Sequence, residues 1–505
     1  MSNPGSNQGN SLFQKACLIL ITGLFLFRAP AYAPDTEFIV GGFSSDTSIP
    51  VLIANSDEWS PFSLYYWGQD RFGSWPFLLY RWGEHWTPIA IFLGMYIYLH
   101  AGLLVFMRNK SPVLLTVSLL ILHLLRPLSG FIFDIAQPYG WQLGSILIAL
   151  AFAESKSSSK IQIRILLFFF SFLSIWLSPS SVLFLSIFPV LQSALLSRTW
   201  GFRIVHAIKS ASPVVLAYAA HSIMRRFVVG YNAETFYEEY ETPLKWKSEL
   251  VAPAWNAIRK QVFSEWELAL WVLATIVLFW AIISVFAGQK RWKWRSQLPA
   301  LTFMAGSVLF LLSILPLNWF SLNQHGARYL ALPRYLMLLG LALLLFQELK
   351  HHYARVLTHA IPNPLVSVSN SLLAFVAILC FWPALADRSI SEHYQYRKAI
   401  AKTLESKYPH LPLIGNYWET YVYSSLQSRP NIPQPGPGQY QRTPFLQSKV
   451  LGASSILINH QGFPMSVKEG RPIPEFRFQG QSYRLERENI LSGDPAISLY
   501  IKLNR

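Results

Sequence analysis

Charged residues and cysteines are scarce in this chain of 505 residues. Charged residues make up 13% and hydrophobic residues 52%, whereas soluble domains carry about 25% charged residues. The two cysteines, Cys17 and Cys380, each lie inside an apolar run, which excludes a disulfide framework and a cysteine metal site. The sequence has no Gly-rich phosphate loop, which argues against nucleotide-dependent chemistry. The high hydrophobic and low charged content predicts that most of the chain lies in a membrane.

Long apolar runs recur from Leu12 to Leu385 and then stop. A bilayer-spanning helix needs about 20 residues, so we predict about eleven transmembrane helices. They cover Leu12 to Arg28, Pro88 to Phe106, Pro112 to Phe131, Trp141 to Ala153, Ile161 to Leu177, Val182 to Leu196, Ile204 to Met224, Trp266 to Ala287, Leu298 to Leu317, Tyr335 to Phe346 and Leu365 to Leu385. The first run also resembles a signal peptide that ends at Ala31-Tyr32-Ala33.

Lysines and arginines gather in alternate loops between these runs. Such loops stay preferentially in the cytoplasm, so we assign the basic set to that side. The set comprises Lys15, Arg108, Lys110, Lys156, Lys160, Arg198, Arg203, the run Lys290 to Arg295, Lys350 and Arg355. The intervening loops carry most of the carboxylates and face the exterior. Because the net charge of +16 is spread between apolar runs, it does not predict a nucleic-acid partner.

The chain becomes polar after Leu385. Ser389 to Tyr408 and Tyr417 to Leu426 are predicted helices, and Pro433 to Gly438 is a predicted breaker. Alternating segments at Ser454 to Asn459, Ser482 to Glu486 and Ile497 to Leu503 predict strands. The predicted fold is therefore an all-α polytopic membrane domain over residues 1–387, followed by a small extracytoplasmic α/β domain over residues 388–505.

The first external loop, residues 30–87, is too long for a simple connection, and such loops are usually functional. It contains Asp46 and the acidic pair Asp57 and Glu58. Carboxylates beside a membrane surface can take a proton from an acceptor hydroxyl or bind a metal ion. The alternative is an acidic loop that is merely solvated.

The same loop carries a family-like order of motifs. Ser45-Asp46-Thr47-Ser48-Ile49 is followed by Leu52-Ile53-Ala54 and by Tyr65-Tyr66-Trp67-Gly68-Gln69-Asp70-Arg71-Phe72-Gly73-Ser74. Further stretches are Ile175 to Pro179, Ala327 to Pro333 and Gly415 to Tyr421. Together they resemble a bacterial family of GT-C glycosyltransferases related to the dolichyl-phosphate-mannose protein mannosyltransferases. The chain departs from this family at Thr47, where an acid is usual, and at the extra Trp67.

This resemblance implies a hexosyl- or pentosyltransferase in the bacterial plasma (inner) membrane. It would move a sugar from a polyprenyl-phosphate carrier to an acceptor on the outer face. Asp46 is then the catalytic base, with Asp57 and Glu58 as the second choice. That pair could also bind a divalent cation, and we expect no other cofactor. The expected partners of the protein are the lipid-linked sugar, membrane lipids and an acceptor of unknown chemistry.

Arginines at outer helix ends are the candidates for holding the carrier phosphate. A guanidinium is always charged and forks onto phosphate oxygens. The predicted substrate-binding residues are Gln69, Arg126, Arg225, Arg328, Tyr329 and Arg334, and Arg226 lies beside them. The alternative role for these arginines is to extend toward lipid headgroups.

Two other classes of protein would share these features. A flippase or transporter of lipid-linked glycans also needs outer arginines, but it should carry polar or broken helices at the bilayer midplane. A ligase or polymerase of surface polysaccharide shares the arginines and leaves the acidic first loop unexplained.

Overall fold

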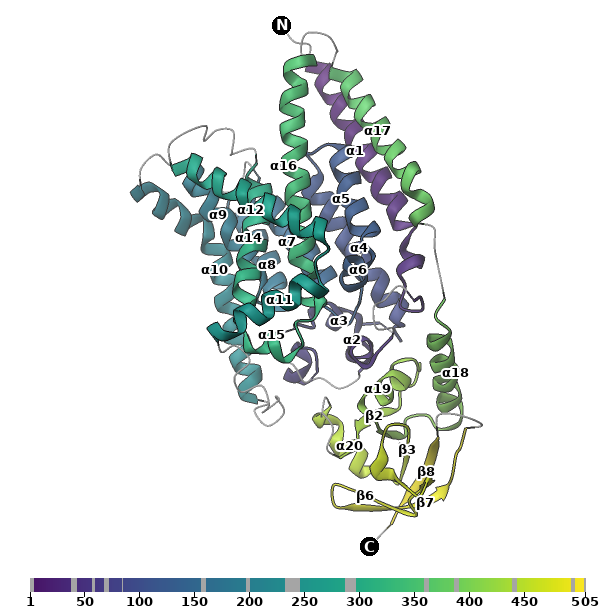
Figure 1. Ribbon diagram of the computed structural model, residues 1–505. Coiled ribbons are helices and arrows are strands. Elements are labelled where there is room, and N and C mark those ends of the chain that lie inside the picture. Colours follow the sequence, from purple (N-terminus) through teal and green to yellow (C-terminus); the bar gives the residue numbers. More distant parts are fainter. Residues whose placement is uncertain are drawn as a thin grey trace.

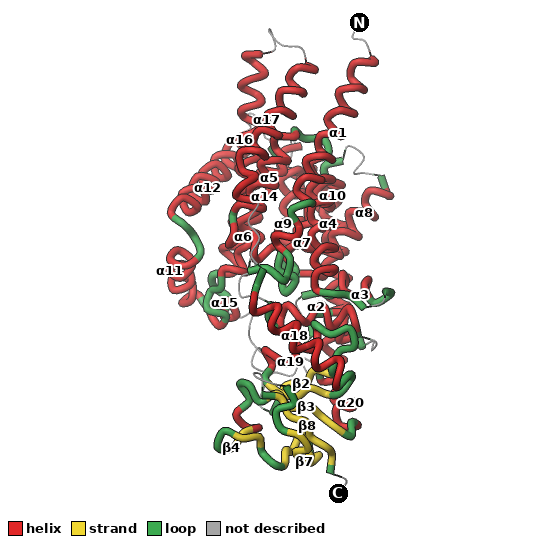
Figure 2. The backbone as a smooth tube through the Cα atoms, turned by 90° about the vertical axis from the view of Figure 1, so that its right-hand side faces the viewer, coloured by secondary structure: helices red, strands yellow, loops and turns green. Residues whose placement is uncertain are grey.

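The computed structural model contains a helical bundle and a smaller terminal domain with a β-sheet (Figure 1). It describes residues 4–37, 43–56, 60–67, 72–83, 85–155, 160–196, 200–231, 246–286, 297–357, 363–385, 390–437, 443–491 and 496–503. The strands gather at the end of the molecule that lies opposite the N-terminus (Figure 2). We call the end of the bundle beside the terminal domain the domain end.

Long apolar helices build the bundle. They are α1 (Pro4–Leu26), α4 (Pro88–Met107), α5 (Pro112–Leu124), α7 (Tyr139–Ala153), α8 (Ile161–Leu177), α9 (Ser181–Leu196), α10 (Trp200–Tyr231), α12 (Glu265–Phe286), α14 (Leu298–Ile314), α16 (Ala331–Leu357) and α17 (Asn363–Leu385). Gly102 of α4 lies against the backbone of Gly144 of α7, where a Cβ would collide. Small residues of this kind let helix backbones approach closely within a membrane.

Short elements connect these helices. They are η1 (Ala29–Tyr32), α2 (Ser45–Asn55), η2 (Pro61–Leu64), α3 (Trp75–Tyr80), α6 (Arg126–Ile132), η4 (Ser248–Leu250), α11 (Val251–Gln261), α15 (Asn318–Leu322) and η5 (Ala327–Leu330). Of these, α2, α3, α11 and α15 lie toward the domain end (Figure 1). α2 is almost wholly buried. The long first loop is therefore folded into the molecule.

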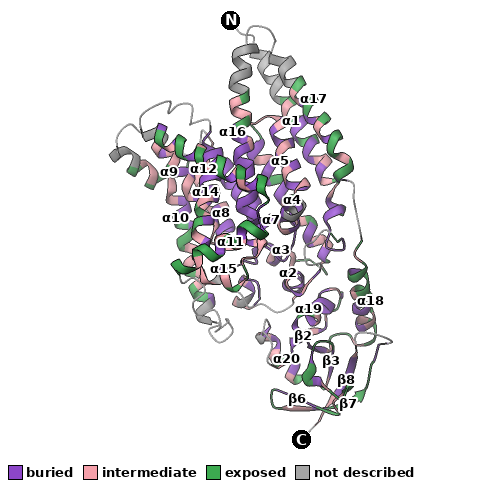
Figure 3. Ribbon diagram, in the orientation of Figure 1, coloured by how far each residue is buried: buried purple, intermediate pink, exposed green. Residues whose placement is uncertain are grey.

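Several bundle helices expose large apolar side chains on their outward faces (Figure 3). On α17 these include Leu372 and Leu379, and on α12 they include Ile276 and Ile283. Among the described residues, four helical segments are long and apolar enough to cross a membrane: Pro88–Met107, Glu265–Ser284, Ala327–Leu349 and Val368–Leu385. Six further apolar helices are shorter. Contiguous exposed apolar faces fit contact with lipid, while the predicted number of crossings stays a prediction.

One predicted helix is divided into two. Pro112 to Phe131 was expected to be continuous, but α5 ends at Leu124 and α6 starts at Arg126. Pro127 explains the break, because proline has no N–H and its ring collides with the carbonyl group four residues earlier. The break turns the chain toward Asp134.

The terminal domain has a mixed sheet with strand order β2-β1-β3-β8-β7-β6. Its strands are β1 (Pro412–Gly415), β2 (Ile432–Pro435), β3 (Ser455–Asn459), β6 (Glu475–Phe478), β7 (Gln481–Arg487) and β8 (Ile497–Lys502). β1 runs parallel to β2 and β3, whereas the pairs β3–β8, β8–β7 and β7–β6 are antiparallel. A separate hairpin joins β4 (Val467–Lys468) to β5 (Arg471–Pro472).

Short helices complete this domain: α18 (Glu392–Lys407), α19 (Tyr417–Ser425), η6 (Pro444–Leu446), α20 (Gln447–Gly452) and η7 (Pro464–Ser466). The predicted strands and both predicted helices of the tail are present. The predicted breaker at Pro433 was wrong in part, because Pro433 and Pro435 lie in β2. β2 is an edge strand, where a missing N–H is tolerated.

Candidate functional site

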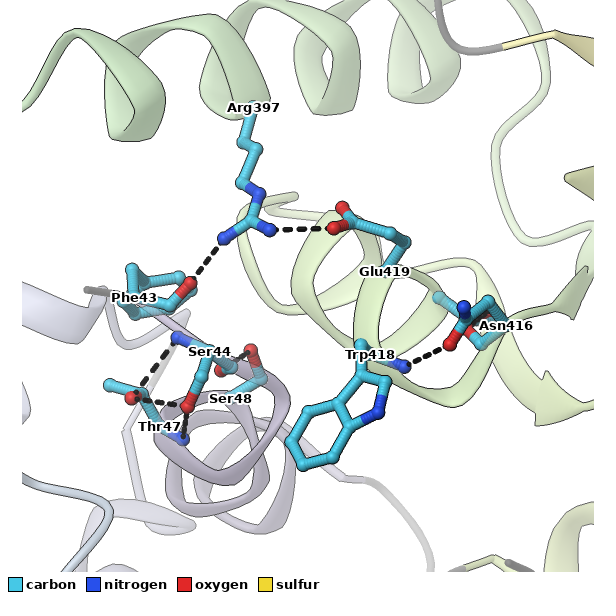
Figure 4. A network of polar contacts seen from close by, with 9 residues as sticks. Phe43, Ser44, Thr47, Ser48, Arg397, Asn416, Trp418 and Glu419 are labelled. Carbon is cyan, nitrogen blue, oxygen red and sulfur yellow. Dashed lines mark hydrogen bonds and ion pairs between the residues drawn. The ribbon is translucent and has the colours of Figure 1, made fainter. Parts of the chain in front are cut away.

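Asp46 lies in the first turn of α2, at the domain end. Ser44 caps this helix: its Oγ accepts a hydrogen bond from the N–H of Thr47, and the Thr47 hydroxyl accepts one from the N–H of Ser44 (Figure 4). This reciprocal pair is a capping box. Thr47 is fully buried, so the residue that replaces the family's acid has a structural role in this chain. The cap fixes the start of the helix and with it Asp46.

The terminal domain contacts this helix start through α18 and α19. Tyr417 Oη donates a hydrogen bond to Asp46 Oδ1 over 3.1 Å. Arg397 donates to the carbonyl oxygen of Phe43 over 2.5 Å and forms an ion pair with Glu419 at 2.6 Å (Figure 4). Asp46 is therefore held between the bundle and the terminal domain, with its side chain half-buried.

A second carboxyl group, that of Asp134, lies near Asp46. Its Oδ1 accepts a hydrogen bond from the N–H of Ala136 over 2.8 Å, and the residue is buried. Burial raises the pKa of Asp134 to about 7; the negative charge of Asp46 acts in the same direction, and the Ala136 N–H and Arg328 oppose it. Asp46 and Arg328 are thus both within electrostatic reach of this carboxyl.

Tyr66 is close enough to both carboxyl groups for their charges to act on it. Its hydroxyl donates to the carbonyl oxygen of Ile135 over 3.1 Å. Burial, followed by the charges of Asp134 and Asp46, raises the pKa of Tyr66 well above its ordinary value. This tyrosine therefore stays neutral, and its ring packs against Phe72 and Phe77.

Arg328 supplies the positive charge of the site from η5. Its Nη2 donates to Tyr329 Oη over 2.7 Å, and its guanidinium lies 4.8 Å from the centre of the Tyr329 ring. Tyr329 in turn donates to Asn323 Oδ1 over 2.8 Å. Arg328 is half-buried and keeps further donors for a phosphate group. The predicted residues Arg328 and Tyr329 thus form one unit.

Arg334, a further predicted phosphate ligand, is buried in an ion pair. Its Nη2 lies 2.6 Å from Glu267 Oε1, and its Nε donates to the same oxygen over 3.2 Å. Glu267 also accepts hydrogen bonds from the backbone and side chain of Ser264. Both charges are already satisfied, so this arrangement favours joining α12 to α16 over holding a substrate.

The remaining predicted residues contribute less to this picture. Arg225 is half-buried on α10 and Arg226 is exposed beside it. Arg126 starts α6, and its side chain lies outside the described part. Asp57, Glu58 and Gln69 also lie outside the described residues. Among the residues that are described, no group of three or more His, Cys, Asp and Glu side chains could hold a metal ion.

The cluster of Asp46, Asp134 and Arg328, which we call the acidic site, combines a half-buried carboxylate, a carboxyl that titrates near neutral pH and a guanidinium. It can remove a proton, stabilise positive charge and bind an anion. The sequence predicted Asp46 and Arg328 but not Asp134 or Tyr417. Asp134 was one acid among several in external loops, and only its burial distinguishes it.

No protein-family model matches this chain, and no curated protein does. Two solved structures are similar over 89% of this chain and 70% of theirs, each with a TM-score of 0.36. One is the archaeal oligosaccharyltransferase AglB from Archaeoglobus fulgidus in complex with an inhibitory peptide and a dolichol-phosphate, at 10% identity. The other is the Archaeoglobus fulgidus oligosaccharyltransferase tethered with an acceptor peptide, at 12% identity. At this TM-score the residues of this chain itself must support any function.

Proposed function

We propose that this protein is a GT-C glycosyltransferase that moves a hexose or pentose from a polyprenyl-phosphate carrier to an acceptor hydroxyl on the outer face of the bacterial inner membrane. The observation that carries the proposal is the acidic site at the end of an apolar bundle. A lipid-anchored phosphate and a water-borne acceptor can meet at such a place.

Each residue has a role in the proposed reaction. Arg328 binds the carrier phosphate with paired hydrogen bonds. Asp46 takes the proton from the acceptor hydroxyl as the new bond to the anomeric carbon forms. The bond from that carbon to the phosphate oxygen breaks, and the carrier phosphate leaves with the electron pair. Ionised Asp134 stabilises the positive charge that develops on the sugar ring.

A transporter of lipid-linked glycans is the second candidate, because the break between α5 and α6 is a feature of transport proteins. The short helix that follows the break, α6, ends two residues before Asp134, however, which favours a role of the break in forming the acidic site. Release of carrier phosphate from a polyprenyl-phosphate sugar separates the two, since a transporter leaves the sugar-phosphate bond intact.

Asp46→Asn tests the proposed base. General-base catalysis contributes about a hundredfold or more, so the purified variant should bind donor normally and transfer sugar at least about a hundredfold more slowly. Asp57→Asn and Glu58→Gln are the matched controls. Near-normal transfer by Asp46→Asn together with loss in Asp57→Asn would move the base to the second acidic cluster.

Arg328→Lys tests the phosphate contact in the same preparations. Lysine keeps the charge and loses the planar fork. We expect donor binding to weaken by about tenfold, which corresponds to the loss of one charge-assisted hydrogen bond. Unchanged donor binding would leave Arg328 with a structural role only.

A further inference from the structure

A second polar cluster lies inside the bundle, against Phe133. It comprises Arg28, which follows α1, His100 of α4, His123 of α5, and the aromatic rings of Tyr32 and Tyr96. The Phe133 ring packs 5.2 Å from the His123 ring, and the next residue is Asp134. The two clusters thus flank one short stretch of chain, and the proposed reaction uses neither histidine.

The hydrogen bonds of this cluster define its protonation. His100 Nδ1 lies 2.7 Å from the carbonyl oxygen of Tyr96, which can only accept, so Nδ1 carries the hydrogen. His100 Nε2 then accepts from His123 Nε2 over 3.0 Å. His123 Nδ1 is consequently left with a lone pair. It is buried and has no hydrogen-bond partner among the described residues.

Arg28 is the charged member of this cluster. Its guanidinium is close enough to act electrostatically on His123 and Tyr96. Arg28 Nε and Nη2 are buried and have no hydrogen-bond partner within the described part of the chain. The guanidinium lies 5.3 Å from the centre of the Trp382 ring of α17. Such a cation–π contact offsets only part of the cost of taking a charged group out of water.

The position of Arg28 indicates which anion completes the cluster. α1 and α17 lie side by side, and both end toward the terminal domain (Figure 1). Arg28 comes two residues after the end of α1, and Trp382 lies in the last turn of α17. Phe27 is 81% exposed and Leu379 70%, so apolar surface adjoins the half-buried Arg28. An anion with an apolar tail fits this surface, because its tail can lie along the helices while its headgroup reaches the guanidinium.

We propose that Arg28 and His123 form a binding site for the phosphate headgroup of an anionic membrane lipid, separate from the acidic site. Arg28 Nε and Nη2 donate to the phosphate oxygens. His123 Nδ1, which carries a lone pair, accepts a hydrogen bond from a hydroxyl group of the lipid headgroup. This site does not depend on the proposed transferase reaction, because it is defined by binding alone.

Lipid retention by the purified full-length protein tests the site. The protein is offered polyprenyl phosphate, phosphatidylglycerol, phosphatidylcholine or inorganic phosphate, and bound molecules are counted by native mass spectrometry. With phosphatidylglycerol we expect one lipid to be retained by wild type and by Arg328→Gln, and with polyprenyl phosphate we expect wild type to hold one more, at the acidic site. Arg28→Gln and His123→Phe should each weaken phosphatidylglycerol binding at least about tenfold, since each loses a hydrogen bond to the headgroup.

Arg108 is exposed and directly follows the last residue of α4, away from the domain end. Arg108→Gln is therefore the control for loss of an arginine outside the proposed site. His123→Phe keeps an aromatic ring of similar size, so it remains informative if Arg28→Gln fails to fold. Equal retention by wild type and both cluster variants would overturn the proposal. Equal binding of phosphatidylcholine, or of inorganic phosphate with no gain from a lipid tail, would overturn the assignment to an anionic lipid.

Discussion

At the scale of single residues, burial gives the two carboxyl groups of the acidic site different properties. Asp46 is half-buried and accepts a hydrogen bond from Tyr417, whereas Asp134 is buried and its pKa is raised to about 7. The motif around Asp46 is local and could be recognised in the sequence. The burial of Asp134 depends on packing between segments far apart in the chain, such as Tyr66, whose hydroxyl bonds to the carbonyl oxygen of Ile135.

The raised pKa of Asp134 predicts a pH dependence of transfer. Below pH 7 this carboxyl is mainly protonated and neutral, and above pH 7 it is mainly charged. Only the charged form stabilises a positively charged sugar ring, so the rate should rise as the pH increases through about 7. Asp134→Asn should lower the rate about a hundredfold and abolish this rise. Rates of both proteins between pH 5.5 and pH 8.5, a range that covers about 1.5 units on either side of that pKa, provide the measurement.

Glu154→Gln is the control, because it removes an acid at the opposite end of the bundle, where Glu154 pairs with Lys110 at 2.9 Å. Its pH profile should match that of wild type. If Asp134→Asn keeps the same rise near pH 7, another group titrates there and Asp134 has no electrostatic role.

At the scale of elements, the length of the apolar runs predicted where the bundle has helices, and local chemistry explains the errors. Residues 112–131 are mostly apolar, so the run was predicted as one helix in spite of the break that Pro127 imposes. β1, β2 and β6 were missed because they are only four residues long, too short for alternation to be visible. β2 also contains two prolines, which are compatible with a strand only at the edge of a sheet.

The packing of α19 against α2 predicts a role for Tyr417. Its hydroxyl orients Asp46, so Tyr417→Phe should lower the transfer rate about tenfold, the effect of losing a hydrogen bond to a charged group. Donor binding should stay unchanged, because Arg328 is untouched. Tyr421→Phe is the matched control from the same helix: its hydroxyl bonds to Thr443 within the terminal domain.

Steady-state rates and donor affinities of the two tyrosine variants decide this prediction. A structural role would affect both variants, or would weaken donor binding together with the rate. A rate for Tyr417→Phe equal to that of Tyr421→Phe would show that the hydroxyl of Tyr417 does not position the base.

At the scale of the whole molecule, charge patterning predicted that alternate loops lie at opposite ends of the bundle. Contacts in the structure bring loops of the same predicted side together. Gln14 of α1 donates to the carbonyl oxygen of Lys110, and Lys110 pairs with Glu154, so three predicted cytoplasmic segments meet at one end. Asp46 and Tyr417 join the first loop to the terminal domain at the other end. Which end faces the cytoplasm is set by the membrane and by insertion, and the fold alone does not determine it.

We therefore predict that the turn between α4 and α5 is cytoplasmic and that the terminal domain is extracytoplasmic. In a background with Cys17→Ser and Cys380→Ser, single cysteines are introduced by Asn109→Cys or Ser454→Cys, both at exposed positions. A membrane-impermeant maleimide should label the Ser454→Cys protein in intact cells. It should label the Asn109→Cys protein only after permeabilisation, because basic residues beside a span retain their loop inside. The reverse pattern would place the acidic site on the cytoplasmic face, where the proposed transfer to an external acceptor could not occur. Equal labelling of both proteins in intact cells would mean that an odd number of the nine predicted spans between these two positions does not cross the membrane.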